Sequence, residues 1–100
     1  MGPRRRRRPA PEKLQRTEAV LTLLARSPDT HVAAVDVGRA TGFGPAAYPL
    51  LAELDRLGAV EHIWLDEPPS TPRLAYRLTV EGRALASAPR PVLIERLQGG

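Results

Sequence analysis

The sequence predicts a mainly helical α+β domain with one β-hairpin, and two observations lead to this class. Apolar residues recur at intervals of three and four in the segments 11–26 and 45–57, as on one face of a helix. Further along, Leu74, Tyr76 and Leu78 alternate with other residues, as in a strand with one buried face. With 100 residues, of which 42% are hydrophobic, the chain suffices for one small domain with a modest core.

The first helix is expected from Pro11 to Arg26. Pro11 suits a first helical turn, the charge of Glu12 suits the positive end of the helix dipole, and Ser27-Pro28 ends the helix. The side chains expected to form its buried stripe are Leu14, Thr17, Val20, Leu21, Leu24 and Ala25.

A short strand near His31 and a second helix are expected to follow. The valines in this part of the chain favour a strand, whereas Ala33, Val37 and Ala40 are spaced as on a helix face. We therefore expect the strand first and the helix after it. Gly42 is well placed to end this helix in a left-handed conformation.

A third helix is expected from Pro45 to Leu57, directly after this turn. Gly44-Pro45 is typical of a helix start, and Gly58 ends the helix. Pro49 lies inside the segment and removes one backbone hydrogen bond, at a cost that its proximity to the first turn lessens. The apolar stripe consists of Leu50, Leu54 and Leu57.

A β-hairpin is expected next, with strands over residues 59–65 and 74–78. Residues 66–73 contain three prolines and are expected to form an extended tip. Thr79 is expected to cap a further helix that ends near Ala86. The apolar residues that follow Pro89 predict one last short helix.

The order helix, short strand, helix, tight turn, helix and hairpin describes a winged helix-turn-helix domain with a two-stranded wing and a short C-terminal helix. In this fold the third helix can lie in a major groove of DNA, and the hairpin is the wing. We expect a flexible arginine-rich arm over residues 1–10, the winged helix domain over residues 11–88, and a short C-terminal helical segment and tail over residues 89–100.

Three motifs within residues 14–86 carry a family resemblance. They are Ala40-Thr41-Gly42, then Tyr48-Pro49-x-Leu51 with Leu54, Leu57-Gly58 and Val60, and finally Tyr76-Arg77-Leu78-Thr79-x-Glu81-Gly82-Arg83. Through them the sequence resembles the PadR-like family of bacterial transcriptional regulators. The resemblance implies a homodimer that binds a palindromic operator in double-stranded DNA, and it makes Pro49 an expected feature of the third helix.

The predicted dimer contact differs from the family's pattern, because PadR-like proteins usually carry a long C-terminal helix and only residues 91–98 remain here. The apolar cluster of this segment can either join the first helix of a partner chain or fold back on its own domain. The residues assigned to a dimer interface are Leu14, Leu21, Leu24, Val92, Leu93 and Leu97.

The positive charge is concentrated at the N-terminus. Residues 1–13 hold six basic residues and one acidic residue, whereas residues 14–100 hold nine basic and ten acidic residues. The consecutive arginines repel one another and are expected to form a flexible arm that contacts DNA phosphates. A solubilising tail, or contact with an acidic protein or a membrane surface, is the alternative. The arm residues are Arg4, Arg5, Arg6, Arg7 and Arg8.

The folded part offers few candidates for DNA contacts. The residues expected to contact phosphates are Arg39, Thr41 and Arg73. The small residues at the start of the third helix that allow close approach to DNA are Gly44, Ala46 and Ala47, and the methyl group of Ala46 or Ala47 can touch a thymine methyl. Tyr48 suits a phosphate contact and a core position equally well. The alternative for Arg73 and Arg77 is an ion pair with Asp66, Glu67 or Glu61.

The near-neutral body leaves a second function open. A winged helix can also serve as a protein-protein interaction module, here with an arm that binds polyanions nonspecifically. The arm and the family resemblance favour DNA over this alternative.

Other chemistry has little support in the sequence. The absence of cysteine excludes disulfides and thiolate metal sites, and His31 and His62 lie in separate elements. We therefore expect no catalytic site, no metal and no cofactor. Trp64, Phe43 and Tyr76 are expected in the core, with a pocket for a small aromatic effector as the alternative.

The apolar runs are too short for a membrane span, and Pro9-Ala10-Pro11 follows the arginines where a signal peptide would be apolar. We therefore expect no membrane segment and a cytoplasmic, nucleoid-associated protein.

Overall fold

The computed structural model describes residues 9–99, so Arg4 to Arg8 of the predicted arm lie outside the described residues. The fold is mixed α+β and mainly helical, as the sequence predicts. In chain order, the elements are α1 (Pro11–Ala25), β1 (Val32–Ala33), α2 (Ala34–Thr41), η1 (Gly44–Ala46), α3 (Ala47–Arg56), β2 (Val60–Leu65), β3 (Arg73–Leu78), α4 (Val80–Ser87) and α5 (Arg90–Gly99).

The helix-turn-helix unit consists of α2, η1 and α3. Gly42 ends α2 with φ of 79°, the left-handed conformation predicted for it. Gly38 lets α2 approach η1 closely, because a Cβ at this position would lie 2.5 Å from the carbonyl oxygen of Gly44. Pro49 is the third residue of α3, where backbone N–H groups have no partner within the helix, so its missing donor costs little.

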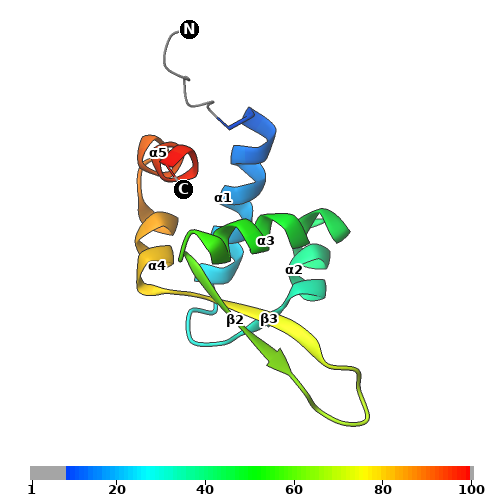
Figure 1. Ribbon diagram of the computed structural model, residues 1–100. Helices are drawn as coiled ribbons and strands as arrows, with labels where there is room; N and C mark the ends of the chain where they lie inside the picture. The colour runs from blue at the N-terminus through cyan, green and yellow to red at the C-terminus, as the bar shows by residue number, and fades with distance from the viewer. Residues whose placement is uncertain (1–8, 100) are drawn as a thin grey trace, which may run out of the picture.

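The wing belongs to a three-stranded antiparallel sheet with strand order β1-β3-β2. Val60 pairs with Leu78 and Leu65 with Arg73, which fixes the register of the hairpin. The short strand predicted near His31 adds to the other edge of β3, where Val32 pairs with Tyr76. The sheet is therefore one strand wider than the predicted two-stranded wing. Figure 1 shows the wing extending from the body on the side away from α5.

The core lies between the helices and the inner part of the sheet. The predicted stripe of α1 is buried except for Ala25, which is exposed. Of the predicted α3 stripe, Leu54 and Leu57 are buried and Leu50 is half-buried, whereas Leu51, which the prediction left out, is fully buried. Val37 of α2 and Leu78 of β3 also belong to the core. Thr79 caps α4 as predicted, because its side-chain oxygen accepts a hydrogen bond from the Gly82 N–H at 3.0 Å. Among the described residues, no helix combines the length and apolar character needed to cross a membrane.

The C-terminal helix α5 folds back on its own domain, which is one of the two arrangements that the sequence leaves open. Leu93 is buried, and Leu97 packs against the core from a half-buried position. Leu14, Leu21 and Leu24, assigned to a dimer interface, are buried in the same chain. Of the residues assigned to that interface, only Val92 is strongly exposed, at 46%. Four of the six residues assigned to the predicted interface are thus buried within one chain: Leu14, Leu21, Leu24 and Leu93.

The expectation that all three aromatic residues lie in the core is wrong for Trp64. Tyr76 is buried, and Phe43 packs against the core with the Arg16 guanidinium 5.6 Å from its ring centre. Trp64, by contrast, is 63% exposed. The reason is its place near the outer end of β2, beyond the part of the sheet that the helices cover.

Candidate nucleic-acid interface

The outward face of α3 is apolar over its first two turns. Ala47, Leu51 and Leu54 point into the core, so the helical period turns Tyr48, Pro49 and Ala52 outward. Tyr48 is 45% exposed, which places it outside the core. The expectation of a DNA contact by Ala47 is wrong, because Ala47 is fully buried. Gly44 and Ala46 are half-buried and remain at the surface of η1.

A hollow of about 390 Å³ lies between α3 and the wing, and we call it the wing cleft. Tyr48 of α3 and Trp64 of β2 are its two aromatic side chains, and Arg73 of β3 is its one charged residue. Four other residues complete the lining: Ala34, Val35, Pro72 and Leu74. The sequence gives no direct signal of this cleft, since it depends on how far the wing extends past the start of α3.

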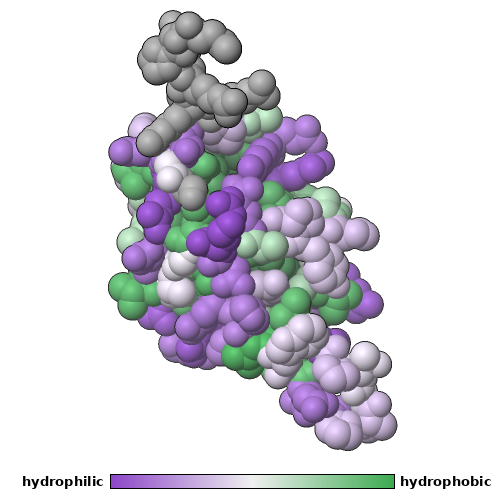
Figure 2. Space-filling view, viewed as in Figure 1, coloured by the Kyte–Doolittle hydropathy of each residue, from purple (hydrophilic) through white to green (hydrophobic). Residues whose placement is uncertain are grey.

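A second hollow, of about 370 Å³, lies on another side of α3, and we call it the arm root. Ala10, near the start of the described chain, lines it together with Ala46, Pro49 and Leu50. Four charged residues of α1 and α3 complete the lining: Glu12, Lys13, Arg16 and Glu53. The segment that holds Arg4 to Arg8 therefore joins the described chain beside the start of α3. Figure 2 shows pale residues in the middle of the right-hand side of the molecule, where α3 begins in Figure 1, with hydrophilic residues above them.

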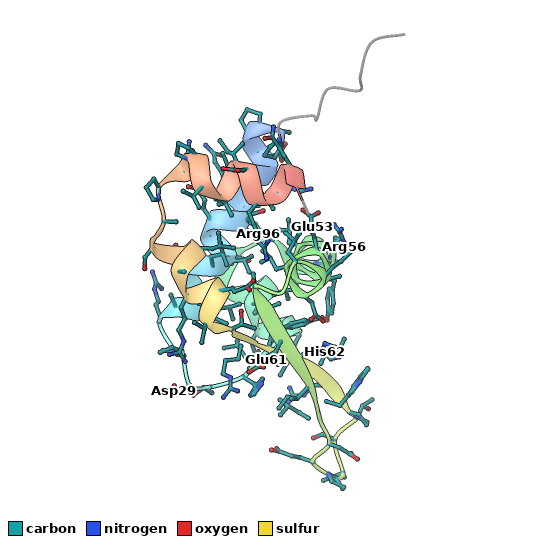
Figure 3. The ribbon with its side chains drawn as sticks, turned by 60° about the vertical axis from the view of Figure 1, so that its left-hand side comes forward. Asp29, Glu53, Arg56, Glu61, His62 and Arg96 are labelled. Carbon is teal, nitrogen blue, oxygen red and sulfur yellow. The ribbon has the colours of Figure 1, made fainter. Side chains whose placement is uncertain are left out.

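Both carboxylates of α3 are paired with neighbouring elements. Glu53 forms an ion pair with Lys13 of α1, with 2.8 Å between Oε2 and Nζ. Oδ2 of Asp55 lies 2.5 Å from Nδ1 of His62 on β2. Figure 3 shows Glu53 and Arg56 on α3 and His62 on the neighbouring strand. Both contacts attach α3 to the elements on its two sides, and the charge of Lys13 lowers the negative charge that α3 presents to an anionic partner.

Two of the phosphate-contact candidates have free guanidinium groups. Arg39 and Arg73 are exposed, and neither takes part in an ion pair or a side-chain hydrogen bond within residues 9–99. Arg77 forms the predicted ion pair, with Nε donating to Oε1 of Glu61 at 2.9 Å. The hydrogen bond and charge of Arg77 lower the pKa of Glu61, which keeps this carboxylate ionised.

Thr41 has a structural role instead of the predicted phosphate contact. Its hydroxyl donates to the Val37 carbonyl at 2.7 Å and accepts the Phe43 N–H at 3.3 Å. Because the hydroxyl hydrogen is already donated, Thr41 has none to give to a phosphate oxygen. The side chain instead closes the end of α2 before the turn.

The tip of the wing is acidic. Asp66 and Glu67 are exposed, and neither forms an ion pair within the described part of the chain. A turn with the Ser70 N–H donating to the Glu67 carbonyl at 2.9 Å closes the tip. Since like charges repel, the tip opposes a phosphate backbone, whereas Arg73 at the base of the wing attracts one. Residues 9–99 contain no group of three or more side chains suited to hold a metal ion.

The comparisons with known proteins support the fold. No protein-family model matches the chain, and no curated protein sequence is similar to it. Among solved structures, the chain is similar to a PadR-like transcription factor from Bacteroides fragilis, with a TM-score of 0.58 and 17% sequence identity. The match covers 75% of this chain and 79% of that one. The resemblance drawn from the sequence motifs is thus supported at the level of the fold.

Proposed function

We propose that this protein is a transcriptional regulator that binds double-stranded DNA with α3 in a major groove. The observation that carries the proposal is that the outward face of α3 borders both the wing cleft and the arm root. DNA lying along α3 therefore has the wing on one side and Ala10, near the start of the described chain, on another. The structural neighbour is a PadR-like transcription factor, and its fold supports this class.

Affinity and register come from different parts of the chain. Arg4 to Arg8 release counterions when they contact phosphates, and Arg39 and Arg73 add two contacts from the folded part. The body alone is close to neutral, so the arm supplies most of the nonspecific affinity. The helix α3 sets the orientation and register of the protein on the duplex. The acidic tip repels phosphates and so confines the contacts of the wing to the base of the hairpin.

We also propose a homodimer on a palindromic site, as the PadR-like resemblance implies. Leu14, Leu21, Leu24 and Leu93 are buried in one chain, so the contact between two chains uses other side chains. Half-sites about 10 base pairs apart would match two copies of α3 in successive major grooves.

Fluorescence anisotropy with the full chain tests the proposal. One labelled duplex carries the region upstream of the protein's own gene, and the other carries the same bases in scrambled order. We expect preference for the upstream duplex and a steep loss of affinity between about 50 and 200 mM salt. A variant with Arg4 to Arg8 changed to Gln should lower the slope of log K against log salt by about 4.5 for each DNA-bound chain, because each phosphate contact contributes about 0.9.

The outcomes separate DNA reading from nonspecific binding. Preference for the upstream duplex that persists in the arginine variant supports sequence reading by the folded part. Equal binding of both duplexes that disappears in the variant contradicts it. That result would favour the second candidate function, a protein-interaction module. The near-neutral body and the acidic wing tip support this alternative.

A further inference from the structure

We infer that α3 reads thymine through its methyl group, so that the preferred DNA contains thymines at fixed positions facing Tyr48 and Ala52. The inference rests on the proposed function and names the base that its site recognises. It follows from which chemical groups the outward face of α3 presents and which it lacks.

The side chains that read bases through paired hydrogen bonds are missing from this face. Adenine is typically read by Asn or Gln, but the chain has no Asn, and its glutamines, Gln15 and Gln98, belong to α1 and α5. Guanine is typically read by Arg or Lys. Arg56, the last residue of α3, is the one basic side chain of that helix, and it already interacts with other groups of the protein. Cytosine is typically read by a carboxylate, but Glu53 and Asp55 are paired.

What the face does present is apolar surface. Tyr48 and Ala52 stand four residues apart on the outward side of α3 and therefore follow one another along the groove. Beside Tyr48 the wing cleft adds the exposed ring of Trp64. In the major groove the apolar feature that distinguishes one base pair from another is the C5 methyl group of thymine. Contact with that methyl removes apolar surface of both partners from water.

Replacing thymine by uracil tests this inference, because uracil keeps the base pair and lacks only the methyl group. The full-length protein first selects duplexes from a library with a randomised central segment. The most enriched duplex is then synthesised in versions that each replace one thymine by uracil. The affinity of the protein for each version is measured by anisotropy. We expect about a threefold to fourfold loss at each contacted thymine, the value for burying one methyl group, and no loss at flanking thymines.

Matched variants assign the contacts. In Ala52→Gly, replacing one of the contacted thymines by uracil should no longer lower the affinity. In Tyr48→Ala, the same should hold for the neighbouring thymine. Ala84→Gly, at an exposed position of α4, has the same helical cost but should leave every uracil effect unchanged. Circular dichroism checks that all three variants are folded.

Two results would overturn the inference. If selected duplexes show a clear sequence preference but bind equally well with uracil throughout, α3 does not read methyl groups, while the proposed DNA-binding function stands. If selection enriches no sequence at all, both the inference and the proposed sequence-specific binding of DNA are wrong.

Discussion

The two sides of the domain use arginine in different ways. On the side of α4 and α5, three arginines pair with carboxylates of other elements: Arg83 with Asp29, Arg90 with Glu18, and Arg96 with Glu81. On the side of α3 and the wing, Arg77 pairs with Glu61 within the hairpin, but Arg39 and Arg73 have no such pair within the described residues. The exposed aromatic side chains of Tyr48 and Trp64 lie on this second side. The difference indicates that one side stabilises the fold and the other keeps its side chains available to a partner.

The largest expected effect is on the free energy of unfolding, and it compares a buried with an exposed side chain on the side of α3 and the wing. Leu51 is fully buried in α3, so Leu51→Ala should lower the free energy of unfolding by about 3 kcal/mol. Trp64→Ala should change it by less than about 1 kcal/mol, because most of this ring is already in water. Urea unfolding followed by circular dichroism measures both variants, since Trp64 is the only tryptophan and its fluorescence is lost in one of them.

Trp64→Ala should nevertheless weaken DNA binding, because the ring forms a wall of the wing cleft. A variant that loses several kcal/mol of stability would show instead that the cleft is part of the core. The division between a stabilising side and a binding side would then be wrong.

Patterns within single elements made most of the fold predictable. The spacing of leucines fixes α1 and α3, Gly42 ends α2, and Thr79 caps α4, all through interactions between residues at most a few positions apart. The hairpin follows from alternation and from the prolines at its tip. Each of these features depends on a local signal that the sequence carries directly.

Features that depend on distant segments were not predictable in the same way. The exposure of Trp64 depends on how far the sheet extends past the helices, and the folding back of α5 depends on contacts with α1, α3 and α4. Ala47 and Tyr48 are neighbours in sequence, yet only the position of α3 against the core decides which of them faces outward. The candidate site was therefore predicted as a region, while its member residues required the structure.

The second prediction compares free with paired arginines. Changing Arg39 and Arg73 together to Gln should reduce the salt slope of DNA binding by about 2 for each DNA-bound chain, because each phosphate contact contributes about 0.9. Arg83→Gln is the matched control, since Arg83 is equally charged but pairs with Asp29 and bonds to the Pro28 carbonyl. Anisotropy over a series of salt concentrations measures all three proteins. An equal change of slope in the Arg83 variant would remove the distinction between the two sides.

The smallest expected effect concerns Arg96, the residue that connects the two sides. Its guanidinium donates to the Leu57 carbonyl at the end of α3 at 2.7 Å and to Glu81 of α4 at 2.8 Å. Arg96→Ala should lower the free energy of unfolding by about 1 kcal/mol, because a helix-terminal carbonyl loses a charged donor. Arg90→Ala is the control, since it removes only an exposed ion pair with Glu18 and should cost less than about 0.5 kcal/mol.

Hydrogen exchange at the last turn of α3 distinguishes the origin of the Arg96 effect. If the bond to Leu57 holds this turn, its amides should exchange faster in Arg96→Ala than in Arg90→Ala, while the amides of β3 stay protected. The stabilising side would then act on the end of α3 through one side chain. Equal exchange in both variants would mean that α5 stabilises the domain only through Leu93 and its apolar neighbours, and that the two sides are energetically separate.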